Sequence, residues 1–549
     1  MKQYQPNEEV DFLIIGAGAA GGVMAKELAT AGFSVVVLEQ GPYLREKDFE
    51  HDEIKYTMLS AMTNNLARQP HSYRKSESET AKVPSQKMIQ YGRQVGGGSV
   101  HFTANYWRLW ESDFKQKSKW GSVAGASLAD WPITYADLEP YYTKTEEELG
   151  VSGLAGANPF EAWRSKPYPL PPLPVKSSGV LFERATRKLG LHTFPTPMAI
   201  LSQPYRGRGA CLHCGFCEGF GCEVRAKSST LATVIPLAER TGRCEIRPDS
   251  YTRKIEIGPN GRVTGAIYFD APRREVFQRA KTVVVCANGS ETPRLLLMSK
   301  SNRFPQGLAN SNGLVGKYLM VDAGYEAHGI FEHPLNEFKS VQATRVIHDF
   351  YEPDPKRSFY GGGGIDARFE YYPISFALTG LPPGAPRWGR EWKTMVARNF
   401  TRTMTLEAHA TCLAREQNHI SLDPTVKDAW GLPALRVTFD FHPDDVSNME
   451  FLLARQMEIL EAAGAQKAWP DRSDDALLPH NHLLGTCRMG DDPKTSVVDR
   501  YHRAHDVPNL FLVDGSSLVT ACCQPTCTIQ TLAYRAADHL GEEARKAAI

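Results

Sequence analysis

Four cysteines within a short run are the first residues that could do chemistry. Cys211, Cys214, Cys217 and Cys222 follow the spacing C-x2-C-x2-C-x4-C, with glycines between them that let the chain loop. An iron–sulfur cluster, a structural zinc ion, and free thiols or disulfides are the competing interpretations. Zinc sites generally present two separated pairs of ligands, whereas this is one compact run, so the spacing favours an iron–sulfur cluster.

A second group of residues has the spacing of a dinucleotide-binding turn. Residues 10–41 read as strand, tight turn, helix and strand. Gly16 permits the turn, Gly18 lets the backbone approach a pyrophosphate, and Gly21 allows the helix to pack closely on the strand. Glu39 ends the second strand, where a carboxylate can accept hydrogen bonds from ribose hydroxyls. Strand, helix and acidic residue together predict a bound dinucleotide.

The bulk composition limits the classes of protein to consider. With 549 residues, 42% of them hydrophobic, the chain exceeds a usual single domain, so we expect two or three domains that share a cofactor. The 63 basic and 62 acidic residues form no long basic run, which argues against a nucleic-acid partner. The acidic, glycine-interrupted start does not resemble an export signal. No apolar run reaches the about 18 residues of a membrane span, so we expect any membrane attachment to be through a partner.

The remaining segments differ in composition. Residues 46–210 are rich in proline and predict a long irregular excursion from the nucleotide-binding part. Residues 240–290 read as β-rich and lead into a helical stretch. Residues 320–475 mix aromatic strands with helices and are expected to line the substrate pocket. Within them, the four consecutive glycines at 361–364 indicate a loop or bulge.

Several motifs, in order along the chain, resemble those of the glucose–methanol–choline (GMC) oxidoreductases. Besides the N-terminal fingerprint there are GRQVGGGS at 92–99, VVVCANGSETPRLLLM at 283–298, HLLGTCRMG at 482–490 and DGS at 514–516. The match runs almost end to end. It implies an α/β fold, in which a doubly wound, Rossmann-like FAD-binding domain is joined to a substrate domain with an antiparallel sheet.

The resemblance also implies that both domains are assembled from separate segments. The FAD-binding domain would comprise residues 7–45, 80–110, 223–320 and 476–549. The substrate-binding domain would comprise residues 46–79, 111–205 and 321–475. Residues 206–222 would form a cysteine-rich, cluster-binding insertion.

Oxidation of an alcohol carbon needs a base for the hydroxyl proton and an acceptor for the hydride. His482 is similar to the family's catalytic histidine, and imidazole titrates near neutrality, so we expect it to be the base. Asn481 would position the same loop. The family places a second His or Asn just before a proline. Here Gln524, before Pro525 and apparently one residue short, is the nearest equivalent, and its amide can both donate and accept.

The family motifs assign the remaining site residues to FAD. His101 lies where some members attach the flavin covalently through a histidine, and covalent and noncovalent contact both remain open. Pro525 and Thr526 would begin the last helix, whose N-terminal amides could stabilise negative charge on the flavin. The expected FAD-binding residues are Gly16, Gly18, Gly21, Glu39, Arg93, Gly97, Ser99, His101, Asn105, Ala287, Asp514, Gly515, Pro525 and Thr526.

The cysteine segment looks like that of multisubunit bacterial sugar dehydrogenases, which act on glucose, fructose, gluconate or glucosides. Their likeness implies a three-iron or four-iron cluster, a small subunit with the export signal, a cytochrome c-type acceptor and a periplasmic, partner-borne location. The function expected is FAD-dependent oxidation of a hydroxyl of a sugar, glycoside or sugar acid. Two alternatives stay open: a cytoplasmic, oxygen-using oxidase with structural cysteines, and a flavoprotein subunit whose chemistry is altered.

Overall fold

A seven-stranded sheet forms the nucleotide-binding part of the protein. The computed structural model describes residues 3–369, 371–472, 480–521 and 524–546. The strands run in the order β5-β2-β1-β8-β7-β6, and β16 pairs with β8. Residues 280–285 of β8 pair in parallel with β1, while its residues 275–279 pair antiparallel with β7. The strands are β1 (Val10–Ile15), β2 (Val35–Leu38), β5 (Cys244–Arg247), β6 (Tyr251–Ile257), β7 (Val263–Phe269), β8 (Glu275–Val285) and β16 (Leu510–Leu512).

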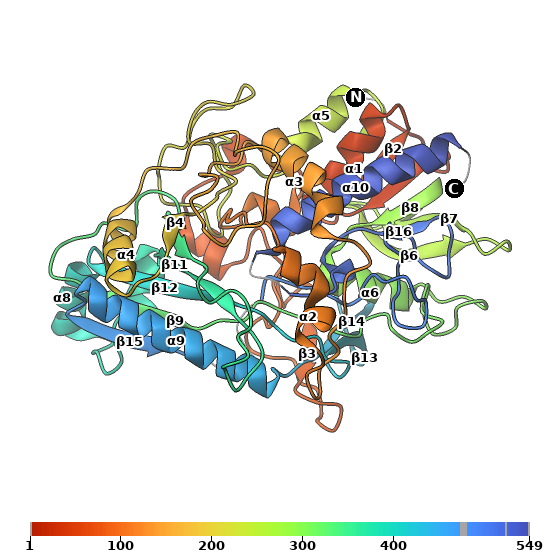
Figure 1. The fold of residues 1–549 in the computed structure, drawn as a ribbon. Helices are drawn as coiled ribbons and strands as arrows, with labels where there is room; N and C mark the ends of the chain where they lie inside the picture. The colour runs from red at the N-terminus through yellow and green to blue at the C-terminus, as the bar shows by residue number, and fades with distance from the viewer. Residues whose placement is uncertain (1–2, 370, 473–479, 522–523, 547–549) are drawn as a thin grey trace.

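Helices pack on this sheet. The first of them lies in the segment for which the sequence predicted a strand, a turn and a helix. Helix α1 (Ala19–Thr30) follows β1 directly and packs against α5 (Val234–Arg240) and α10 (Pro525–Arg545), which come from distant parts of the chain. Figure 1 shows α1 and α10 side by side near the two termini. The parallel strands and packed helices confirm the predicted Rossmann-like fold.

The second large element is a six-stranded antiparallel sheet in the order β15-β9-β12-β11-β10-β4. Helices α4 (Ser177–Lys188) and α9 (Pro443–Ala463) pack together on it (Figure 1). Alternate residues of a strand point to opposite faces, so one face of this sheet can be polar. Its strands are β4 (Thr193–Pro195), β9 (Glu326–Ile330), β10 (Arg345–Ile347), β11 (Gly363–Arg368), β12 (Thr403–Ala410) and β15 (Lys467–Asp471).

Smaller elements connect the two sheets. A three-stranded sheet in the order β13-β14-β3 contacts α6, and α3 packs on α10. The bounds are β3 (His71–Arg74), β13 (His419–Lys427), β14 (Pro433–Thr438), α2 (Gln116–Trp120), α3 (Tyr135–Leu149), α6 (Asn288–Met298), α7 (Pro373–Thr379) and α8 (Gly389–Asn399).

Two expectations about local structure were wrong. The proline-rich segment 46–210 contains well-formed helices, and α3 begins with a capping box in which Thr134 and Asp137 bond each other's backbone amides. The glycines at 363 and 364 begin β11 and are buried. A Cβ on Gly363 would lie 2.3 Å from the carbonyl oxygen of His409, so close packing of two strands, not a loop, explains this glycine.

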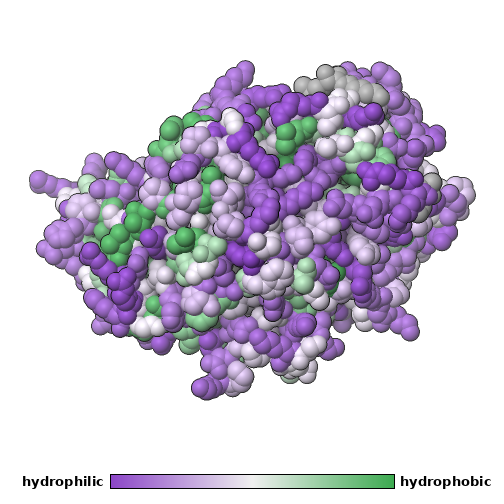
Figure 2. Space-filling view, turned by 45° about the horizontal axis from the view of Figure 1, so that its top comes forward, coloured by the Kyte–Doolittle hydropathy of each residue, from purple (hydrophilic) through white to green (hydrophobic). Residues whose placement is uncertain are grey.

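Within the part of the chain that the structure describes, no helix combines the length and hydropathy needed to cross a bilayer. The face drawn in Figure 2 is mostly hydrophilic, and its hydrophobic side chains gather in small separate patches.

Candidate active site

One large cavity collects residues from both halves of the protein. Its volume is about 720 Å³, and it is lined by β1, the turn after β8, the start of α10 and strands of the antiparallel sheet. Most of the site residues predicted from the sequence lie on it: Gly16, Gly18, Glu39, Gly97, Ser99, His101, Ala287, Asn481, His482, Asp514, Gly515, Gln524, Pro525 and Thr526.

The two glycine motifs meet at one end of the cavity. Gly97 has a φ of +54°, and a Cβ there would lie 2.7 Å from the Cα of Gly18. Gly21 lies outside the cavity lining, but a Cβ on it would lie 1.9 Å from the carbonyl oxygen of Gly16. Bare backbone therefore faces the cavity at the N-terminus of α1, as a pyrophosphate requires.

Glu39 lies at the end of β2, with its carboxylate bonded to nearby backbone. Its Oε2 accepts from the amide of Ala17 at 3.0 Å and its Oε1 from the amide of Gly41 at 2.9 Å. Burial raises the pKa of Glu39 to about 7, although these amides and the charge of Arg93 act against that rise. Hydroxyl donors from a ribose would complete the bonding of this carboxylate and favour its charged form.

Two residues predicted to contact FAD lie outside the cavity lining. Arg93 is close enough to Glu39 for its charge to lower the carboxyl pKa, but it does not line the cavity. Asn105 is buried and donates from Nδ2 to Asp366 at 3.0 Å. Neither residue therefore faces the cavity, and for Asn105 the bond to Asp366 directs the side-chain amide away from it.

His101 fits a flavin ring beside it. Its side chain lines the cavity and is buried, and its Nε2 has no hydrogen-bond partner among the described residues. Burial and the nearby Lys227 charge lower the pKa of His101 to about 3, so the ring is neutral. A buried ring nitrogen without a partner is costly, and a bound ligand would relieve that cost.

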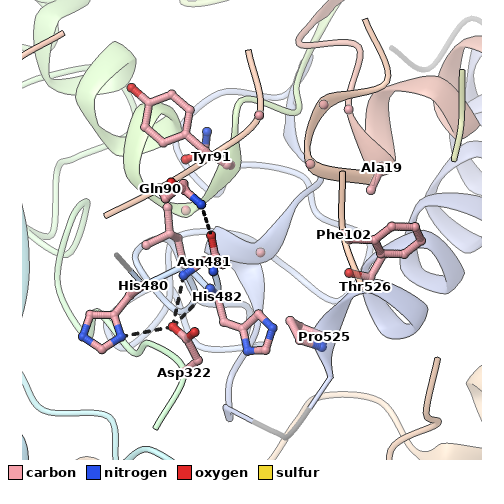
Figure 3. A pocket seen from close by; sticks show the side chains of 18 of the residues that line it. Ala19, Gln90, Tyr91, Phe102, Asp322, His480, Asn481, His482, Pro525 and Thr526 are labelled. Carbon is pink, nitrogen blue, oxygen red and sulfur yellow. Dashed lines mark hydrogen bonds and ion pairs between the residues drawn. The ribbon is translucent and has the colours of Figure 1, made fainter. Parts of the chain in front are cut away.

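Asp322 holds the loop that carries His482. Its Oδ1 accepts from His480 Nδ1 at 3.1 Å, from the amide of Asn481 at 3.1 Å and from the amide of His482 at 3.4 Å (Figure 3). Asn481 Oδ1 also accepts from Gln90 Nε2 at 3.2 Å, which gives this loop a second contact. The His482 ring is thereby left near Pro525, at the start of α10 (Figure 3).

The electrostatics of this loop suit a base. Burial lowers the pKa of His482, while the carboxylate of Asp322 acts to raise it and His409 to lower it. Burial also acts to raise the pKa of Asp322, but the hydrogen bond from His480 and the nearby imidazoles lower it to about 2. His482 is therefore a neutral proton acceptor at pH 7, beside a permanent negative charge that stabilises it once it is protonated.

Replacement of Asp322 by Asn is expected to shift the pH dependence of turnover. The carboxylate raises the pKa of His482, so its removal should lower that pKa further and move the acid limb of kcat to lower pH. We also expect kcat to fall about 10-fold, because the loop loses a charged acceptor. A pH profile of flavin reduction measures both; an acid limb at higher pH would contradict the assignment.

The antiparallel sheet adds polar residues that sequence analysis missed. Arg368, Glu407 and His409 line the cavity, and His409 Nδ1 lies 3.0 Å from Gln524 Nε2. The alternation of Glu407 and His409 with apolar residues in β12 could have identified these two residues from the sequence. Asp322 and His480 had no comparable local signal.

The four cysteines converge on a small void of about 20 Å³. They are free thiols, and Cys211 Sγ accepts from the amide of His213 at 3.3 Å. The donor set and an amide directed at sulfur fit a thiolate-bound cluster. The same segment reaches the large cavity: Glu218 and Gly219 line it, and the amide of Gly219 donates to the carbonyl of His101 at 2.8 Å.

Comparison with known proteins identifies the family. The family model for GMC oxidoreductase matches residues 180–322 and 414–533, and a Rossmann-like NAD(P)-binding model matches residues 14–58. The chain is 33% identical to 2-methyl-1,2-propanediol dehydrogenase of Mycolicibacterium austroafricanum over 97% of this chain and 95% of the relative. The protein is a GMC oxidoreductase. It is therefore an FAD-dependent enzyme that oxidises CH–OH groups, and the predicted fold and family are confirmed.

Other relatives of this GMC oxidoreductase are named as parts of a gluconate and a fructose dehydrogenase. It is 28% identical to the gluconate 2-dehydrogenase flavoprotein of Pantoea cypripedii, covering 98% of this chain and 94% of the relative. It is also 28% identical to the fructose dehydrogenase large subunit of Gluconobacter japonicus, covering 96% and 97%. The structure of pyridoxine 4-oxidase from Mesorbium loti superposes with a TM-score of 0.65 at 16% identity, covering 96% and 98%, which supports the fold alone.

Proposed function

We propose that this GMC oxidoreductase is a dehydrogenase for a hydroxyl of a sugar, glycoside or sugar acid. The observation that carries the proposal is His482, a neutral imidazole held at the cavity by a loop that Asp322 fixes. Bound FAD supplies the hydride acceptor. His482 takes the hydroxyl proton, and Asp322 stabilises the resulting imidazolium.

The direct test is anaerobic bleaching of the flavin absorbance by a panel of sugars and polyols. We expect at least one sugar to bleach it, and the reduced enzyme to pass its electrons to an artificial dye without producing peroxide. Peroxide formed in step with substrate in air would favour the oxidase alternative. No bleaching by any member of the panel would favour a flavoprotein subunit with altered chemistry.

We also propose that Cys211, Cys214, Cys217 and Cys222 hold an iron–sulfur cluster of three or four irons. The convergence of four free thiols on one void supports this proposal. A bound cluster would accept single electrons and pass them toward the surface, where Cys214 is exposed. The segment is also bonded to the backbone of His101, which keeps it against the flavin cavity.

Replacement of Cys217 by Ala is expected to lower the iron and acid-labile sulfide content and to remove the cluster's paramagnetic resonance signal. Cys217 is the buried member of the set, so its loss removes a ligand that no water can easily replace. Cys244→Ala in β5 is the matched control, because Cys244 is also buried but remote in the fold. Stoichiometric zinc without iron in the unaltered protein would contradict the proposal.

The proposed partners follow from the relatives and the electron path. A small subunit carrying an export signal and a cytochrome c-type acceptor would place the enzyme in the periplasm, associated with the membrane only through that assembly. Related proteins named as a large subunit and a flavoprotein support a multisubunit enzyme. Co-purification with a tagged small subunit from the periplasmic fraction tests this; recovery only from the cytoplasm would favour the oxidase alternative.

His101 is proposed to bond FAD covalently through its unpartnered Nε2. We expect yellow flavin to remain with the precipitate when the protein is denatured in acid, and to move to the supernatant in His101→Ala. All flavin in the supernatant of the unaltered protein would show noncovalent binding instead.

A further inference from the structure

The antiparallel sheet supplies a chain of hydrogen bonds that the reaction above does not use. Asp366 in β11 is paired directly with Glu407 in β12, and His409 lies two residues further along the same face of β12. His409 lines the cavity and is buried, whereas Asp366 lies behind it and is fully buried. This chain of hydrogen bonds ends at Gln524, the residue that precedes α10.

The bonding around Asp366 determines how the imidazole can be protonated. Its Oδ2 lies 2.9 Å from His409 Nε2, 2.6 Å from Arg368 Nη2 and 3.0 Å from Asn105 Nδ2. Burial acts to raise the pKa of Asp366, but the charge of Arg368 and the hydrogen bonds from Arg368 and His409 hold it well below its usual range. An ionised carboxylate only accepts hydrogen bonds, so the proton of a neutral His409 ring belongs on Nε2. Arg368 Nη2 and His409 Nε2 thus share one carboxylate acceptor. Arg368 Nη2 also lies 2.8 Å from Nε2, and a guanidinium only donates, so the alternative in which Nε2 accepts from Arg368 and the proton lies on Nδ1 is the one that the nitrogen spectra below must exclude.

The other ring nitrogen then sets the orientation of Gln524. With the proton on Nε2, Nδ1 has only a lone pair and must accept. The Gln524 amide nitrogen, 3.0 Å away, is the donor. Its carbonyl oxygen is thereby directed away from His409, and Gln524 itself lines the cavity. A glutamine without this partner could turn its amide by half a rotation at little cost.

We propose that His409, held by Asp366, is a positioning residue that fixes the Gln524 carbonyl as a hydrogen-bond acceptor for a substrate hydroxyl. The inference rests on the proposed function for its substrate, an alcohol that donates from a hydroxyl group. It explains how a glutamine can serve in place of the family's Asn or His: its long, flexible side chain is fixed by β12 of the antiparallel sheet. His482 and Gln524 then meet the substrate from two independently held elements.

A double-mutant cycle tests the coupling. We expect His409→Ala and Gln524→Ala each to lower kcat/KM for the best alcohol by about 10-fold to 100-fold, as for a lost, buried hydrogen bond. The double variant should be no worse than about 3-fold below the poorer single variant, because the two residues act as one unit. His409→Asn, whose side-chain amide can still bond Gln524, should recover part of the loss. Losses that multiply in the double variant would overturn the proposal.

A second measurement needs no substrate. Ring nitrogen spectra of holoenzyme labelled with ¹⁵N-histidine should show His409 protonated on Nε2, with its signals assigned by their absence in His409→Asn. In Gln524→Ala the Nδ1 resonance should move while Nε2 changes little. A proton on Nδ1, or an Nδ1 signal that does not respond to Gln524→Ala, would overturn the proposal.

His328→Gln provides the control for removing a buried histidine from the same sheet. His328 in β9 bonds Thr405 of β12 and does not line the cavity. His328→Gln should leave the His409 signals unchanged. Its kcat/KM should lie within about 3-fold of the value for the unaltered enzyme. If no alcohol bleaches the flavin but the nitrogen spectra behave as expected, the proposed substrate class fails and the positioning of Gln524 stands. If an alcohol bleaches the flavin but the nitrogen spectra do not behave as expected, the proposed function stands and the positioning of Gln524 fails.

Discussion

Replacement of His482 by Ala should lower kcat by about 100-fold to 10,000-fold, the usual contribution of a positioned general base. The ring lies on the cavity and its pKa is lowered by burial, so the unaltered enzyme holds a ready proton acceptor at neutral pH. Without it, the substrate proton must leave to water. Stopped-flow measurement of flavin reduction at saturating substrate isolates this step from electron transfer to an acceptor.

The pH dependence of kcat is the second measurement that tests His482 as the base. In the unaltered enzyme kcat should fall as the pH drops below the lowered pKa of His482 and stay level through neutrality, because only the neutral ring can accept a proton. His482→Ala should lose that acid limb. Asn481→Ala is the control, because Asn481 is the exposed neighbour of His482 on the same loop, and it should cost about 10-fold or less. A full acid limb retained in His482→Ala would assign the base elsewhere.

Replacement of Gly16 by Ala should prevent FAD retention and lower the free energy of unfolding by about 3 kcal/mol or more. Gly16 has a φ of +100°, and a Cβ there would lie 2.3 Å from the carbonyl oxygen of Cys286, at the end of β8. Backbone cannot move away as a flexible side chain could. The turn that faces the cavity would therefore be displaced. The ratio of FAD to protein after desalting, together with thermal unfolding, measures both effects.

Gly32 offers a matched comparison for the backbone strain alone. It has the same φ of +100°, but a Cβ there would meet nothing within 4 Å. Gly32→Ala should therefore cost only about 1–2 kcal/mol, the penalty of a left-handed conformation, and should keep FAD bound. Equal losses in the two variants would mean that conformational strain, and not the contact with Cys286, makes Gly16 necessary.

The nucleotide-binding half could be predicted from the sequence because its signals are local. Strand, turn, helix and second strand follow one another in residues 10–41, and the structure has β1, α1 and β2 there. The glycines are required by backbone contacts made within that unit and with β8. His482 could likewise be singled out, because its motif is a continuous run.

The cavity wall from the antiparallel sheet could not be predicted in this way. His409 and Gln524 are 115 residues apart, and Asp322 is 158 residues from His480. No single-chain periodicity specifies which strands pair or in what register, and a shift of one residue in β12 would turn His409 to the opposite face.

The sequence by itself determined the Rossmann-like fold and the glycine turns, and it singled out His482 as the candidate base, because short-range spacing dictates those features. Only the tertiary structure decided that Asp322 holds His482 and that Asp366 and His409 hold Gln524. It also decided that the cysteine segment lies against the flavin cavity. These contacts depend on strand register and on packing between domains, and both are set by burial across the whole chain.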